Sequence, residues 1–246
     1  MDGRSMDGTD RPWGFARACI RFNGRNAKFI NNTFSDSNWT RLLFLDWTNV
    51  KSNVENRKTQ IKGNQIHISP TSTFVNIQGD IPRNGILMTN NMMDIGCGII
   101  IANGSVTGLT YTGNTWTGPF PNKADHPGVS LYNPYTNFAP IYFASKNSQF
   151  NTISGNTFSS IDEDNNRRPT NFIRIGSDVH FSGSTITGNT FVRCTEEPIF
   201  FDGTLADGGA ANVPIIGNTT NRPDMCNSTF IGNGTNATDV LMADPF

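Results

Sequence analysis

A short pattern of apolar and polar positions recurs along this chain. Each copy reads apolar, variable, Gly or Asn, Asn, variable, apolar. A pattern that returns every few dozen residues predicts a solenoid, in which each copy belongs to one supersecondary unit. Clear copies occupy residues 29–34, 61–66, 88–93, 111–116, 153–158 and 186–191, and weaker copies begin at residues 215 and 230.

A second pattern, apolar–variable–apolar, lies between the copies of the first. It is rich in β-branched and aromatic residues and alternates with a period of two, which is typical of strands with one buried face. Between 13 and 19 residues lead from it to the next Asn of the first pattern, whereas 10 to 29 residues lead from that Asn onward. We therefore expect one regular corner and one variable corner. The copies are residues 43–45, 75–77, 99–101, 141–143, 173–175 and 199–201, with an earlier copy at 20–22.

The Asn of the first pattern is expected to occupy equivalent corners. Gly adopts a positive φ without strain, and Asn tolerates it better than most residues. Asn-Gly turns are typical of β-hairpins, but here the order is mostly Gly-Asn, which favours a parallel β-helix over an antiparallel sandwich or propeller. Buried amides must be hydrogen-bonded, so we expect a ladder of side chains. Its members would be Asn64, Asn91, Asn114, Asn156 and Asn189.

The inward residues of the second pattern are expected to form one continuous core. Because side chains at equivalent strand positions meet across neighbouring turns, they should lie in a single file. The file would contain Ile77, Ile101, Phe143, Ile175 and Phe201.

The Gly-Asn-Thr-Phe corners and short Ile-x-Phe strands resemble the right-handed parallel β-helix of the pectate-lyase-like superfamily. The Asn-, Thr- and Ser-rich variety resembles bacteriophage tailspikes and capsular depolymerases. The resemblance implies an all-β, single-stranded right-handed parallel β-helix of about seven turns over residues 18–235. Residues 1–17 would be an N-terminal segment or a truncated earlier turn, and residues 236–246 a C-terminal tail.

Composition narrows the classes of partner. The chain has 246 residues and a formal net charge of −1, which argues against nucleic acid. No apolar stretch reaches the ~20 residues that a membrane span needs. The four cysteines and three histidines lack metal-ligand spacing, and no nucleotide or cofactor fingerprint occurs, so we expect neither a metal nor a cofactor.

The variable corner carries most of the candidate chemistry. Insertions fall there in consecutive turns, at residues 117–140, 159–171 and 192–198, and loops on neighbouring turns should lie side by side. A glycosidase needs two carboxylates flanking the scissile bond, whereas a lyase needs a base and a cation beside a uronate. The candidate catalytic residues are Asp125, Asp162, Glu163, Asp164 and Glu196. The candidate substrate-binding residues are His126, Tyr132, Tyr135, Tyr142, Arg167, Arg168 and Phe200. A solvated acidic turn followed by compensating arginines is the alternative for the second loop.

Two outward columns are expected on the strands of the second pattern. The first contains apolar residues, which indicates a face covered by loops or by other subunits, or one that stacks on sugar rings. It runs through Arg21, Phe44, Asn76, Ile100, Tyr142, Arg174 and Phe200. The second has small residues between two acids and would form a shallow groove. It runs through Asn23, Asp46, Gln78, Ala102, Ala144, Gly176 and Asp202.

The resemblance implies a virion or extracellular protein, assembled as a homotrimer, that recognises bacterial surface polysaccharide such as capsule or O-antigen. Depolymerisation, by hydrolysis or by elimination, would be an additional activity. A non-catalytic β-helical fibre segment or adhesin-like spacer is the alternative, and a secreted pectate-lyase-like enzyme is a third. No nucleic acid or membrane is expected as a partner.

Overall fold

The computed structural model is all-strand in the part of the chain that it describes. No helix occurs there, and hence none that is long and apolar enough to cross a membrane. The described residues are 18–22, 26–35, 41–46, 58–67, 73–79, 85–94, 97–103, 106–118, 139–144, 146–160, 171–176, 179–193, 197–201, 213–220 and 242–243.

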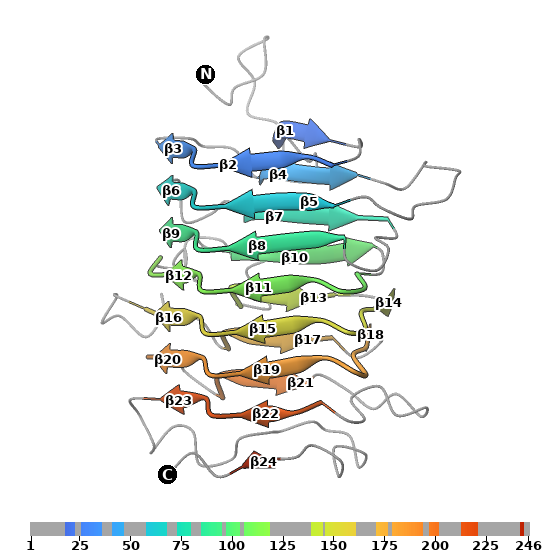
Figure 1. The fold of residues 1–246 in the computed structure, drawn as a ribbon, viewed down its shortest axis with the longest axis vertical. Coiled ribbons are helices and arrows are strands. Elements are labelled where there is room, and N and C mark those ends of the chain that lie inside the picture. The colour runs from blue at the N-terminus through green and yellow to red at the C-terminus, as the bar shows by residue number, and fades with distance from the viewer. Residues whose placement is uncertain are drawn as a thin grey trace, which may run out of the picture.

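Three long sheets run the length of the molecule, and every strand pairing in them is parallel (Figure 1). Sheet A contains β1 (Ala18–Phe22), β4 (Arg41–Asp46), β7 (Thr73–Gln78), β10 (Cys97–Asn103), β13 (Ile141–Phe143), β17 (Ile173–Ile175) and β21 (Ile199–Phe201). Sheet B contains β2 (Lys28–Ile30), β5 (Thr59–Lys62), β8 (Ile86–Thr89), β11 (Thr110–Thr112), β15 (Thr152–Ser154), β19 (Thr185–Thr187), β22 (Ile215–Ile216) and β24 (Met242–Ala243).

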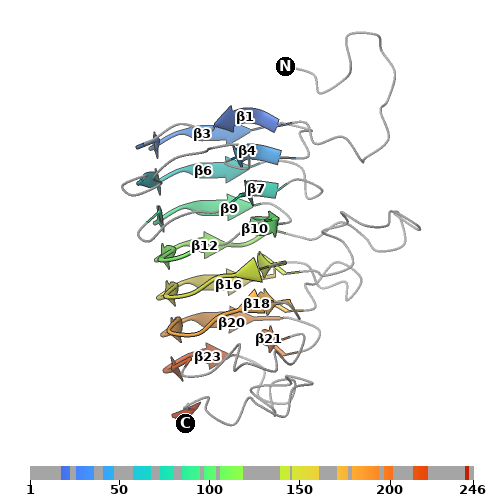
Figure 2. The ribbon, with the colours of Figure 1, turned by 90° about the vertical axis from the view of Figure 1, so that its right-hand side faces the viewer.

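Sheet C follows sheet B along the chain after one short corner in every turn. It contains β3 (Thr33–Ser35), β6 (Gln65–His67), β9 (Met92–Asp94), β12 (Thr115–Trp116), β16 (Thr157–Ser159), β20 (Thr190–Val192) and β23 (Thr219–Thr220). A small fourth sheet pairs β14 (Lys146–Asn147) with β18 (Val179–His180). Both views show the strands of each sheet stacked in chain order along one axis (Figures 1 and 2). This arrangement agrees with the expected parallel β-helix. Sheet B also includes β24, which lies in the segment expected to be a tail.

The corner between sheets B and C carries the predicted asparagine ladder. All five expected members are at most 1 % exposed. The side-chain nitrogen Nδ2 of Asn114, for example, donates to Oδ1 of Asn156 at 3.1 Å and to the carbonyl oxygen of Met88 at 2.9 Å. The same Oδ1 accepts the main-chain N–H of Asn114 at 2.8 Å. Each ladder amide therefore uses both of its donors and its acceptor, as burial requires.

The residue before each ladder asparagine has a positive φ, which explains the choice of Gly or Asn there. Asn90 has a φ of 54° and Gly113 a φ of 66°. In this conformation a β-carbon approaches the following carbonyl, a contact that Gly avoids and that Asn tolerates. The corner is thus specified by two residues, one for backbone shape and one for hydrogen bonding.

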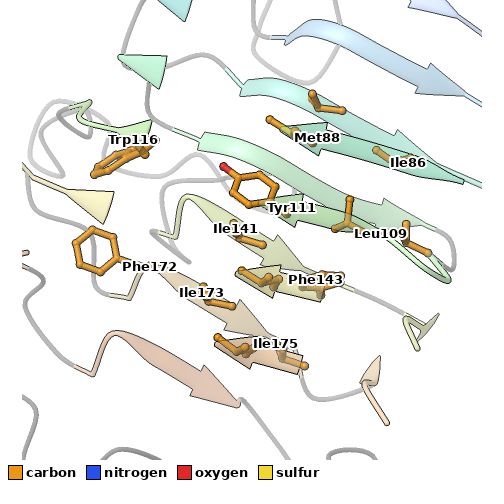
Figure 3. Close-up of a cluster of buried hydrophobic side chains, with 14 of the residues drawn as sticks. Ile86, Met88, Leu109, Tyr111, Trp116, Ile141, Phe143, Phe172, Ile173 and Ile175 are labelled. Atoms are coloured by element: carbon orange, nitrogen blue, oxygen red, sulfur yellow. The ribbon is translucent and has the colours of Figure 1, made fainter. Parts of the chain in front are cut away.

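The three sheets enclose one continuous apolar core. The register places Ile77, Ile101, Phe143, Ile175 and Phe201 on neighbouring strands in a single file, as predicted. Phe143 is fully buried and packs edge-to-face on Phe181 with ring centroids 4.9 Å apart. Figure 3 shows side chains from all three sheets converging on the interior. There Trp116 and Phe172 lie with centroids 5.9 Å apart.

One expected alignment is wrong. The second outward column assumed that Ala102 faces Gln78, but the register shifts after Ile101, and Gln78 pairs with Asn103. Such a bulge inserts one unpaired residue and bends the strand locally. Ala102 therefore interrupts the column. Asn23 and Asp202, at its ends, lie outside the described residues.

Candidate functional site

The three insertions do rise from one corner, between sheet C and sheet A. They leave the ends of β12, β16 and β20, and they return at β13, β17 and β21, which are neighbours in sheet A. At their bases, the main-chain N–H of Phe172 donates to the carbonyl oxygen of Pro198 at 2.8 Å, and that of Ile141 donates to Phe172 at 3.0 Å. The bases of consecutive insertions are therefore side by side, as predicted.

The candidate side chains on these insertions are outside the described residues. This holds for Asp125, His126, Tyr132, Tyr135, Asp162, Glu163, Asp164, Arg167, Arg168 and Glu196. Tyr142 and Phe200 are described, because they lie on the strands themselves.

Tyr142 and Phe200 lie in one outward column with Arg174 between them. The register pairs Tyr142 with Arg174 and Arg174 with Phe200. Their inward neighbours in the same strands are fully or almost fully buried, whereas all three side chains of the column are half-buried. Since neighbouring strands are about 4.8 Å apart, the column from Tyr142 to Phe200 spans about 10 Å. This is close to the length of two linked sugar rings.

Arg174 is held against Phe200. Its guanidinium carbon lies 5.0 Å from the centre of the Phe200 ring, within the range of a cation–π contact. This contact orients the planar guanidinium group, whose fork of N–H donors is of a kind that suits planar anions and hydroxyl groups. Aromatic, cationic and aromatic side chains thus follow one another on three consecutive strands.

Small residues lie beside this column. Ala144 and Gly176 follow at the next outward positions of their strands, and Gly176 is buried. A β-carbon at Gly176 would lie 3.0 Å from the carbonyl oxygen of Phe143, so the backbones approach closely at this point. A larger residue at position 176 would have little room, which explains the small residue beside the column.

Further toward the N-terminus, the outward residue Asn76 is buried. Asn76 belongs to the outward column, in register with Phe44 and Ile100, but only 3 % of it is exposed. That burial arises within this one chain. The outward column is therefore closed to solvent at Asn76, whereas Tyr142, Arg174 and Phe200 are partly exposed.

Asn171 is a residue at the bases of the insertions that sequence reasoning missed. It is fully buried at the return of the second insertion, and its Nδ2 donates to the carbonyl oxygen of Glu197 at 2.7 Å, at the return of the third. Among the residues that the structure describes, its Oδ1 has no hydrogen-bond partner, nor has the buried Oγ of Ser160 at the other base of the second insertion. No repeated pattern marks Asn171, because its role depends on the loop that it anchors.

The described residues do not gather a metal site. No group of three or more His, Cys, Asp or Glu side chains lies close enough there to hold an ion. His67 contacts Asp94, with Nδ1 2.7 Å from Oδ2, but the imidazole is 73 % exposed on sheet C. An exposed pair of this kind contributes little to stability.

Comparisons with known proteins return no match, whether the chain is compared with protein-family models, with curated proteins or with solved structures.

Proposed function

We propose that this protein is a right-handed, tailspike-like β-helix of about seven turns that recognises bacterial surface polysaccharide along the outer face of sheet A. The observation that carries the proposal is the in-register column of Tyr142, Arg174 and Phe200. Aromatic rings offer flat apolar faces to the C–H groups of sugar rings, while a guanidinium donates to sugar hydroxyl and carboxylate oxygens.

The insertions that return at β13, β17 and β21 would extend the proposed site. Their bases lie beside β13, β17 and β21, the same strands that carry the column. Depolymerisation would use carboxylates from these loops, with Glu163 and Glu196 as the first candidates and Asp125, Asp162 and Asp164 as the others. Two carboxylates at suitable separation serve as acid and nucleophile or as acid and base. Arg167, Arg168, His126, Tyr132 and Tyr135 would add contacts to the glycan.

Assembly as a homotrimer on a virion, or secretion, would suit this role, because several equivalent sites raise the avidity for a repetitive polymer. The alternative is a non-catalytic fibre segment or spacer, and the third is a pectate-lyase-like enzyme.

A panel of purified capsular and O-antigen polysaccharides tests the proposal. Binding is followed by retention on immobilised glycan, hydrolysis by new reducing ends, and elimination by the ultraviolet absorbance of unsaturated uronates. We expect retention on at least one acidic or neutral polysaccharide. Absence of both binding and cleavage across the panel would favour the structural spacer.

A further inference from the structure

A different face of the solenoid carries a regular array of hydroxyl groups. On sheet B the inward residue of each strand is flanked by two outward ones, and in β11, β15 and β19 both outward residues are Thr or Ser. The register aligns them into two columns that run parallel to the long axis. One column contains Thr110, Thr152 and Thr185, and the other contains Thr89, Thr112, Ser154 and Thr187; together we call them the hydroxyl face.

The hydroxyl face is uncharged. The outward positions of β8, β11, β15 and β19 hold no Asp, Glu, Lys or Arg, and the remaining position is Leu87, which is 37 % exposed. The hydroxyl groups of Thr112 and Ser154 lie 3.2 Å apart. Those of Thr110, Thr152 and Thr185 have no hydrogen-bond partner among the residues that the structure describes. They are therefore available to water.

The spacing of this array is fixed by the fold. Strands repeat at about 4.8 Å along the axis, and residues two apart in a strand are separated by about 6.6 Å. In ice, each water oxygen has four tetrahedral neighbours at ~2.75 Å. This geometry makes the lattice repeat at about 4.5 Å in one direction and at about 7.3 Å in the perpendicular direction. The spacings of the hydroxyl face therefore agree with the repeats of ice to within about a tenth in each direction.

The array is also rigid. The backbone beneath it is held by the asparagine ladder on one side and by fully buried residues such as Tyr111, Ile153 and Ile186 below. Thr has few accessible rotamers because it is β-branched. A single hydroxyl–water hydrogen bond contributes little net free energy, because water makes the same bond in bulk. A rigid array of such bonds orders a water layer without further loss of conformational entropy in the protein.

We propose that the hydroxyl face binds ordered water at the surface of ice. The methyl groups of Thr and the side chain of Leu87 discourage competing liquid-like hydration, and the absence of charge removes groups that would hold water in another geometry. A second copy of the chain fits this face poorly. The array spans about 14 Å by about 7 Å, far less than the ~800 Å² per partner of a stable protein interface.

Partition into slowly growing ice tests this proposal, with thermal hysteresis as a second readout. Wild-type protein is expected to concentrate in the ice fraction and to lower the freezing point below the melting point. Thr152→Tyr places a bulky ring at the centre of the hydroxyl face and is expected to lose most of both effects. Thr190→Tyr is the matched control, because Thr190 is an exposed outward residue of sheet C.

Circular dichroism and thermal unfolding establish that both variants keep the fold. Exclusion of the wild-type protein from ice would overturn the proposal. So would full ice partition of folded Thr152→Tyr, or an equal loss in Thr190→Tyr. None of these outcomes depends on polysaccharide binding, which takes place on sheet A.

Discussion

The side-chain nitrogen of Asn156 donates to Oδ1 of Asn189 at 2.9 Å, across one turn of the solenoid. Asn156 also donates to the carbonyl oxygen of Tyr111 and accepts from Asn114. Replacing Asn156 with Leu removes these partners at a position that is 1 % exposed. We expect a loss of about 1–3 kcal/mol in the free energy of unfolding, measured by urea titration, because buried polar groups are left unsatisfied.

Asn32 supplies the matched control. It lies at the first rung of the ladder, it is exposed, and its side chain makes one ladder bond, to Oδ1 of Asn64 at 3.0 Å. Asn32→Leu should cost clearly less than Asn156→Leu. Equal and small effects of the two substitutions would mean that the ladder contributes little to stability.

The residue before a ladder asparagine gives a second prediction. A β-carbon at Gly113 would lie 2.5 Å from Oδ1 of Asn90, whereas at Gly188 the nearest atom is the nitrogen of Gly155 at 4.0 Å. Oδ1 is the end of the exposed Asn90 side chain and must rotate away, so Gly113→Asn should be the less stable of the two variants. Gly188→Asn should stay within about 1 kcal/mol of wild type, since Asn tolerates a positive φ and reduces the entropy of the unfolded chain. Thermal unfolding of the two variants side by side decides this, and a reversed order would contradict the corner geometry.

The core file predicts the cost of a cavity. Phe143 is fully buried, so Phe143→Ala should destabilise the protein by about 3–5 kcal/mol. Phe150 is 48 % exposed and provides the same chemical change at the surface. Phe150→Ala should cost much less in the same denaturant titration. Similar losses for the two would show that Phe143 is not part of a tightly packed core.

Carboxylates on the insertions give a catalytic prediction that applies once a cleaved polysaccharide is identified. Crowded carboxyl groups split their pKa values, which allows one to act as proton donor. We expect at least one of four variants to lose turnover and retain glycan binding. The variants, in order of priority, are Glu163→Gln, Glu196→Gln, Asp162→Asn and Asp164→Asn. Initial rates and equilibrium binding on the same substrate measure this. Full activity in all four would place the chemistry elsewhere, for example near Asp46 or Asp202.

The repeated parts of the fold could be predicted because the same residue types recur at equivalent positions of many turns. The ladder asparagines and the inward residues around Phe143 occur at equivalent places in many turns, so their shared environment can be read from residue type. A second corner shows the limit. There the main-chain N–H of Leu109 donates to Oδ1 of Asn151, and that of Asn151 donates to Oγ of Ser184. Different residue types perform the same role, and no pattern results.

Features that occur once could not be predicted. The bulge at Ala102 follows from strand pairing rather than from a residue pattern. The bond from Asn171 to Glu197 depends on how one insertion returns to sheet A. The candidate acids are on insertions that differ in length and sequence from turn to turn, so periodicity gives no information about their separation. Tyr142 and Phe200 could be placed because they lie on strands.

Glycan titration against the column on sheet A tests the central claim most directly. The affinity for the polysaccharide that the wild-type protein binds is measured for the Tyr142→Ala and Phe200→Ala variants. Met92→Ala is the control, because Met92 lies on sheet C and is 60 % exposed. Each column variant should weaken binding about tenfold, which corresponds to about 1.4 kcal/mol, while Met92→Ala should bind as wild type does. Unchanged affinity in both folded column variants would contradict recognition on this face.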